Sequence, residues 1–113
     1  MAYNADLAER VRLEIIDREG LTERNVFGGR GFLIDGNMAC GVIGNDVLLR
    51  PGPEALNQAL ALPYCVQFEG NGRVMTGWVR MLPAGHDDDA ILREWVRRSA
   101  DYTATLPPKS AKR

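Results

Sequence analysis

Residues 27–50 constrain the fold more than any other part of this sequence. They contain three apolar runs, residues 32–34, 38–43 and 47–49, separated by two short turn segments. The first turn, Asp35-Gly36, suits a two-residue hairpin of type I′, in which both central residues need positive φ. Gly44, Asn45 and Asp46 form the second turn. Because strands joined by tight turns pair antiparallel, this stretch predicts three consecutive antiparallel strands.

A helix is predicted before this block. Leu7, Val11 and Ile15 recur every four residues, which places them on one helix face. Asn4 is the expected N-cap, and Gly20 is expected to end the helix in a left-handed conformation.

Two more helices and two more strands are predicted after residue 50. Pro53 fits the first position of a short helix that Pro63 ends. Residues 66–68 and 75–82 then form two strands around a turn at residues 70–72. The final helix begins at the acidic run of residues 87–89, which supplies its cap, and ends before Leu106-Pro107.

The predicted order is therefore helix, three strands, helix, two strands, helix. It describes an α+β two-layer sandwich, with an antiparallel sheet covered by helices on one face. Both residue parities of the strands are apolar in places, so we also expect partial cover on the second face, or an oligomer. We expect one domain over residues 1–108 and a disordered basic tail over residues 109–113.

Composition points away from several protein classes. The formal net charge is -1, which gives no overall field for nucleic acid or a membrane surface. No apolar run approaches the roughly 20 residues that span a bilayer, and the N-terminus lacks the features of a signal peptide. We therefore expect a cytoplasmic protein with no membrane contact, in which Cys40 and Cys65 are buried free thiols.

Residues for catalysis or metal binding do not gather in a recognisable pattern. His86 is the only histidine and is expected in an exposed loop, without the partner and nucleophile that acid–base catalysis needs. The three aspartates beside it lack the alternate spacing of a calcium loop and suit a helix cap better. Trp78 and Trp95 are expected to anchor the core. We predict no catalytic residue, no metal ligand and no cofactor.

Two arginines are candidate ligand-binding residues. Arg30 lies in a glycine-rich segment that could approach a phosphate, although its spacing is not that of a P-loop and a strand start or bulge is the simpler interpretation. Arg50 precedes the second helix, whose N-terminus could attract an anion with it. The structural alternative ties Arg50 to Glu54 or to a backbone carbonyl.

A third candidate site is a basic cluster for nucleic acid. Arg93, Arg97 and Arg98 of the last helix, together with the tail from Lys109 to Arg113, could contact phosphates. The cluster is interleaved with Asp89, Glu94 and Asp101, so a solvated helix face is the favoured interpretation.

Several motifs together resemble the N-terminal domain of the TfoX/Sxy family. They are Phe27-Gly28-Gly29, residues 36–42, residues 49–54, Gly77-Trp78-Val79, and the Trp95 helix ending in Leu106-Pro107. The resemblance covers essentially the whole chain, as a stand-alone domain. It implies a fold similar to secretion chaperones and a regulatory, non-catalytic role, because the family's namesakes are competence coactivators of the cyclic-AMP receptor protein.

The leading functional prediction is thus a non-enzymatic regulator or adaptor that binds an unknown protein partner. A homodimer of this chain is one form that such binding could take. The alternatives are a nucleic-acid-binding regulator using Arg93, Arg97 and Arg98, and a small-molecule or anion sensor using Arg30 or Arg50.

Overall fold

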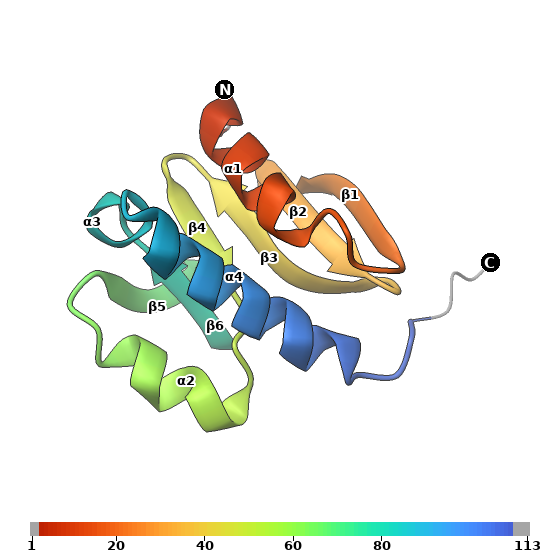
Figure 1. The fold of residues 1–113 in the computed structure, drawn as a ribbon. Helices are drawn as coiled ribbons and strands as arrows, with labels where there is room; N and C mark the ends of the chain where they lie inside the picture. Colours follow the sequence, from red (N-terminus) through yellow and green to blue (C-terminus); the bar gives the residue numbers. More distant parts are fainter. Residues whose placement is uncertain (1–2, 110–113) are drawn as a thin grey trace.

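A computed structural model describes residues 3–109 of the chain as one antiparallel sheet with helices packed on it (Figure 1). The six strands are β1 (Leu21–Val26), β2 (Gly29–Ile34), β3 (Asn37–Ile43), β4 (Asp46–Leu49), β5 (Cys65–Gly70) and β6 (Arg73–Met81). They lie in the order β1-β2-β3-β4-β6-β5, with every neighbouring pair antiparallel. The helices are α1 (Ala5–Ile15), α2 (Pro53–Leu60), α3 (Pro83–His86) and α4 (Asp89–Ala104). The predicted α+β class is confirmed.

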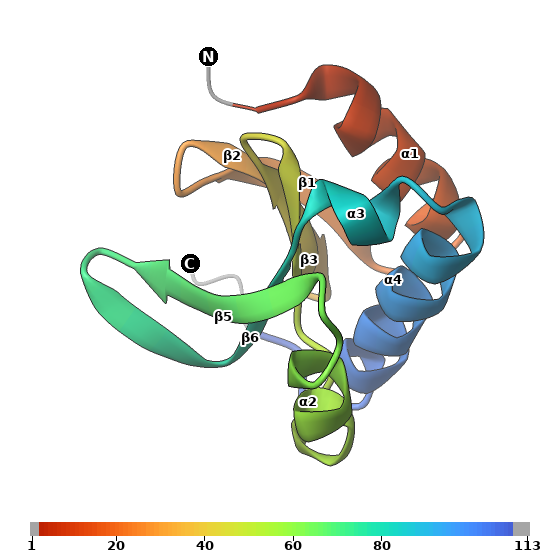
Figure 2. The same cartoon turned by 90° about the vertical axis from the view of Figure 1, so that its left-hand side faces the viewer.

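The main core lies between the sheet and the pair α1 and α4, which pack side by side on one face (Figures 1 and 2). The four-residue periodicity of Leu7, Val11 and Ile15 is confirmed, since all three are buried in this core. Asn4 caps α1 by accepting a hydrogen bond from the Leu7 amide at 3.0 Å. Asp88 caps α4 in the same way, through the amides of Ala90 and Ile91.

The strand count differs from the prediction. Four strands precede α2, because residues 21–26 form β1, whereas the sequence indicated only a short extension over residues 25–27. The β1–β2 turn is Phe27-Gly28, with φ of 55° and 75°, and a bulky aromatic residue is a rare occupant of this conformation. Thr22, Glu23 and Arg24 also lack the apolar alternation by which a strand is recognised.

The helix ends were also predicted in part wrongly. α1 ends at Ile15 rather than at Gly20, which lies in the turn before β1. Gly20 is still constrained, since it has φ of 83° and a Cβ there would meet Asp35 Oδ1 at 2.2 Å. The short helix α3 was not predicted at all, although Pro83 occupies its first turn as a helix-starting proline would.

The sheet also buries side chains on the face away from α1 and α4, called the second face below. Leu33, Leu48 and Phe68 are buried but stand outside the helix-side core. The β5–β6 hairpin projects on this side of the sheet (Figure 2), and Phe27 reaches Phe68 from the β1–β2 turn. The expectation of partial cover on both faces is met within one chain.

The segment after α4 crosses to the β2–β3 turn. Asn37 Nδ2 donates to the Pro107 carbonyl at 2.9 Å, and the Lys109 amide donates to the Asp35 carbonyl at 2.8 Å. Lys109, which the sequence placed at the start of a disordered tail, is therefore held against the sheet. The remainder of that predicted tail, residues 110–113, lies outside the described residues. Within residues 3–109, none of the helices has the length and apolar character to cross a membrane.

Candidate functional site

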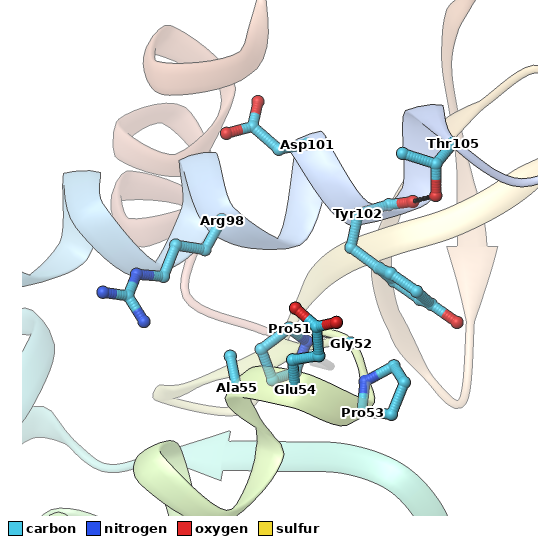
Figure 3. Close-up of a pocket in the computed structure, with 9 residues that line it drawn as sticks. All are labelled: Pro51, Gly52, Pro53, Glu54, Ala55, Arg98, Asp101, Tyr102 and Thr105. Carbon is cyan, nitrogen blue, oxygen red and sulfur yellow. Dashed lines mark hydrogen bonds between the residues drawn. The ribbon is translucent and has the colours of Figure 1, made fainter.

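A cavity of about 490 Å³ separates the start of α2 from the second half of α4 (Figure 3). We call it the α2–α4 cleft; its lining comprises residues 51–55 on one side and Arg98, Asp101, Tyr102 and Thr105 on the other. Gly52 allows the close approach of the two walls, because a Cβ there would lie 2.7 Å from the Tyr102 ring. Gly52 also has φ of 95°, so the turn into α2 depends on glycine at this position.

The charges at the cleft do not favour an anion. The Glu54 carboxylate points from the first turn of α2 toward α4 (Figure 3), and Asp101 forms an ion pair with Arg18 at 2.7 Å. Arg98 is engaged by Glu94 at 3.0 Å and by Gln58 at 3.0 Å. Two carboxylates thus line the cleft beside one guanidinium that already has an anionic partner.

Arg50 lies between two aromatic rings at the end of β4. Its Cζ is 5.7 Å from the Trp78 ring centroid and 5.9 Å from that of Tyr102, and Nη1 donates to the Met38 carbonyl at 3.4 Å. The interpretation that tied Arg50 to a backbone carbonyl agrees with this contact, and Glu54 is not its partner. Trp78 is half-buried beside Arg50, so its predicted role as a core anchor is wrong, while Trp95 is buried in the core as expected.

Arg30 takes part in a charge network beneath α1. Its Nε donates to Glu23 Oε1 at 3.1 Å, and Glu23 also accepts from Arg12 Nε at 2.6 Å and Nη2 at 2.8 Å. The hydrogen bond from Arg12 is the main reason that the pKa of Glu23 lies below its usual value. Burial acts in the opposite direction and raises this pKa, while the hydrogen bond from Arg30 lowers it further. The same pairing raises the pKa of Arg12. Arg30 and Arg50 therefore do not form one site.

The glycines around Arg30 have a structural explanation. A Cβ on Gly29 would lie 2.1 Å from the Val42 carbonyl oxygen, and one on Gly31 would lie 2.8 Å from the Val26 side chain. Close strand approach thus accounts for both glycines, in agreement with the simpler of the two interpretations.

The predicted nucleic-acid cluster is divided in the structure. Arg93 and Arg97 both face Glu14 of α1, with N–O distances of 3.3 and 3.8 Å. Arg98 pairs with Glu94 and stacks over Trp95, 4.6 Å from the ring centroid. Lys109 lies at the β2–β3 turn instead. The three α4 arginines are drawn into ion pairs, and Lys109 does not join them.

His86 was predicted to be exposed, and that prediction is wrong. Its side chain is buried in α3, and Nε2 lies 2.7 Å from the Asn45 carbonyl oxygen. Its Nδ1 is buried without a hydrogen-bond partner among the described residues. The contact joins positions 41 residues apart, so the local polar sequence around His86 gave no sign of it.

The cysteines are buried free thiols, as predicted. Burial raises the pKa of Cys40 to about 12 and that of Cys65 to about 11. Both thiols are therefore protonated at neutral pH. Among residues 3–109, no group of three or more His, Cys, Asp or Glu side chains is arranged to hold a metal ion.

Comparison with known families identifies the fold. The model of the TfoX N-terminal domain matches residues 15–102. The chain belongs to the TfoX N-terminal domain family. The matched region of this TfoX N-terminal domain runs from the last residue of α1 through all six strands and most of α4, and it contains both walls of the α2–α4 cleft up to Tyr102. No curated protein and no solved structure matches the chain.

Proposed function

We propose that this TfoX N-terminal domain is a non-enzymatic regulatory module that acts by binding another protein. Membership of the TfoX N-terminal domain family is the observation that carries the proposal, since the resemblance to that family implies a regulatory role. On this view the chain supplies a preformed surface and performs no chemistry on its partner.

The state of the reactive side chains supports this proposal. Cys40 and Cys65 are buried with raised pKa values, which makes them poor nucleophiles. His86 is buried against a backbone carbonyl and has no access to a substrate. Arg30, Arg93, Arg97 and Arg98 are all engaged by carboxylates. These groups stabilise the fold, and their arrangement offers no nucleophile paired with a base.

Affinity capture with the full chain tests the proposal. The expected result is a stable complex with a specific protein, which copurifies at physiological concentration and is displaced by untagged chain. A protein that remains monomeric and captures nothing under these conditions would remove the proposal. So would reproducible turnover of a substrate that is abolished by changing one polar side chain.

The same preparation tests the nucleic-acid alternative. Phosphate contacts are strongest at low salt, so duplex DNA is titrated at about 50 mM salt. Binding whose salt dependence falls in Arg97→Ala or Arg98→Ala would favour that alternative over the present proposal.

A further inference from the structure

A basic groove runs over the second face of the sheet beside its free edge. The groove has a volume of about 270 Å³ and is lined by Val26, Leu33, Met38 and Gly36, with Asn25, Arg24 and Lys109 completing it. β1 is the first strand in the sheet order, so one side of its backbone has no strand partner within the sheet. We call this site, groove and free β1 edge together, the β1 groove.

The cations of the β1 groove are unlike those of the helix face. The arginines of α1 and α4 are all ion-paired, whereas within residues 3–109 neither Arg24 nor Lys109 has a carboxylate within 4.0 Å. Asp35 lies in the β2–β3 turn beside the groove, but its side chain lies against Gly20 and lines a different cavity, with Arg18. The groove therefore carries uncompensated positive charge.

Lys109 is placed at the groove by specific contacts. Its amide donates to the Asp35 carbonyl at 2.8 Å, and the preceding Pro107 carbonyl accepts from Asn37. Gly36 leaves room for it, since a Cβ there would lie 2.8 Å from the Lys109 Cβ. These contacts fix the backbone of Lys109 beside the groove, which its side chain helps to line.

We propose that the β1 groove binds an extended, acidic segment of a partner protein, which adds to the sheet edge at β1. The free edge can supply main-chain hydrogen bonds. The apolar floor of Val26, Leu33 and Met38 accepts a small apolar side chain, and Arg24 and Lys109 pair with carboxylates on either side of it. The volume suits one or two side chains and is below the usual range for a cofactor site.

A protein segment fits these features better than a nucleic acid does. Single-stranded nucleic acids are bound by aromatic side chains on which the bases stack, and the groove lining contains no aromatic residue among those described. Charge complementarity selects an acidic segment over a basic one, while the backbone edge selects an extended conformation.

The inference rests on the proposed protein-binding function and is tested directly with peptides. Fluorescent six-residue peptides alternating Val with Glu are titrated into the full chain, beside matched peptides in which Gln or Lys replaces Glu. The Glu peptide is expected to bind more tightly than both, with an affinity that falls as salt is raised. On binding, amides of β1 are expected to shift in NMR spectra and to exchange more slowly with solvent.

Charge-removing variants localise the site. Arg24→Gln and Lys109→Gln are each expected to weaken the Glu peptide about threefold, the size of one exposed ion pair. Arg97→Gln is the matched control, because it removes the same charge from the opposite side of the sheet, and it should leave the affinity unchanged. Three results would each overturn the inference. The Glu and Gln peptides could bind equally well, or Arg97→Gln could weaken the Glu peptide as much as Arg24→Gln and Lys109→Gln do. The NMR shifts on binding could also be confined to β5 or to the α2–α4 cleft.

The remaining outcomes separate this inference from the function on which it rests. A partner captured equally well by the native chain and by the double variant Arg24→Glu, Lys109→Glu would leave the proposed function standing and overturn the β1 groove. A second outcome is that the chain binds single-stranded DNA or itself instead of the peptide, and that the double variant loses this binding. That outcome would assign the groove to a different occupant and would also overturn the inference. Capture of no protein at all would remove the proposed function itself.

Discussion

The ring of Phe27 packs edge-on against the ring of Phe68, with the centroids 5.5 Å apart and the planes at 76°. Phe27 lies in the β1–β2 turn with φ of 55°, a conformation that side chains larger than Asn rarely adopt. Phe68 is buried in β5 at the other end of the sheet order. The contact therefore joins two strands that do not pair, and a strained residue makes it.

Substitutions at Phe27 separate the strain from the contact. Phe27→Asn loses the ring contact, about 0.5–1.5 kcal/mol, but relieves a backbone cost of similar size. Phe27→Val loses the ring contact and keeps the strain, because a β-branched residue is poorly suited to positive φ. We expect Phe27→Val to be the less stable variant by about 1 kcal/mol in urea unfolding. A Val variant as stable as the Asn variant would show that the turn is not strained.

The same residue explains why one strand escaped prediction from the sequence. The Asp35-Gly36 turn was recognised because Asp and Gly both tolerate positive φ, and the structure has φ of 51° and 86° there. Phe27-Gly28 has the same geometry with an untypical first residue, so the sequence did not indicate a turn. The helix caps at Asn4 and Asp88 depend on neighbouring residues, and they were predicted correctly.

Most features of the candidate sites depend on long-range contacts. Three contacts join distant parts of the chain: that of His86 with the Asn45 carbonyl, that of Arg93 and Arg97 with Glu14, and that of Lys109 with Asp35. Local pattern can show that these residues are polar, but it cannot show which partner each one meets. The predictions for single arginines were therefore less informative than those for strands and helices.

The Glu23 carboxylate predicts a specific loss of stability in acid. Its folded-state pKa is depressed, chiefly by the hydrogen bonds from Arg12. The ionised Glu23 carboxylate therefore stabilises the folded state. This contribution is complete above the pKa of about 4.5 that the group has in the unfolded chain, and it is lost as the pH falls through the lower pKa of the folded state. Glu23→Gln should cost about 1.5–3 kcal/mol near pH 7, with a smaller difference from the native chain at pH 3.

Urea unfolding between pH 3 and pH 7 measures this difference. Glu94→Gln is the control, since Glu94 pairs with Arg98 on the surface with half of its side chain exposed. Surface pairs contribute little, so its effect should stay below about 1 kcal/mol. A Glu23→Gln cost that is the same at both ends of this pH range would contradict the assignment.

The wall of the α2–α4 cleft predicts an unequal response of two glycines. Gly52 and Gly72 both have positive φ, 95° and 79°, but only at Gly52 would a Cβ meet a neighbour, the Tyr102 ring at 2.7 Å. Gly72→Ala should cost about 1 kcal/mol from backbone strain alone, and Gly52→Ala more than about 2 kcal/mol. Thermal or urea unfolding measures both. Equal costs would mean that the ring of Tyr102 moves away freely.

The thiols predict slow labelling in the native state. With a pKa of about 12, Cys40 is a thiolate in about one molecule in 10⁴ at pH 8, and both cysteines are buried. A thiol reagent at pH 8 should therefore modify native protein at least about 100-fold more slowly than protein unfolded in urea. Mass spectrometry of the variants Cys40→Ser and Cys65→Ser, each of which keeps one cysteine, identifies which thiol is labelled. Rapid labelling of either thiol in the native protein would show that this thiol becomes exposed.

His86 predicts a definite tautomer. Nε2 faces the Asn45 carbonyl oxygen at 2.7 Å, and a carbonyl only accepts, so the ring must carry its proton on Nε2. The buried Nδ1 has no hydrogen-bond partner among the described residues, and the Asp87 carboxylate is 3.9 Å from it. Long-range ¹⁵N–¹H correlation spectra at pH 7.5 should show the Nε2–H form.

Substitutions of His86 test the same hydrogen bond. His86→Leu keeps the volume but leaves the Asn45 carbonyl without its donor, and should lower the free energy of unfolding by about 1–3 kcal/mol. His86→Gln, which can restore a donor, should cost less. An Nδ1–H spectrum, or a Leu variant more stable than the Gln variant, would show that this hydrogen bond does not hold α3 to the turn between β3 and β4.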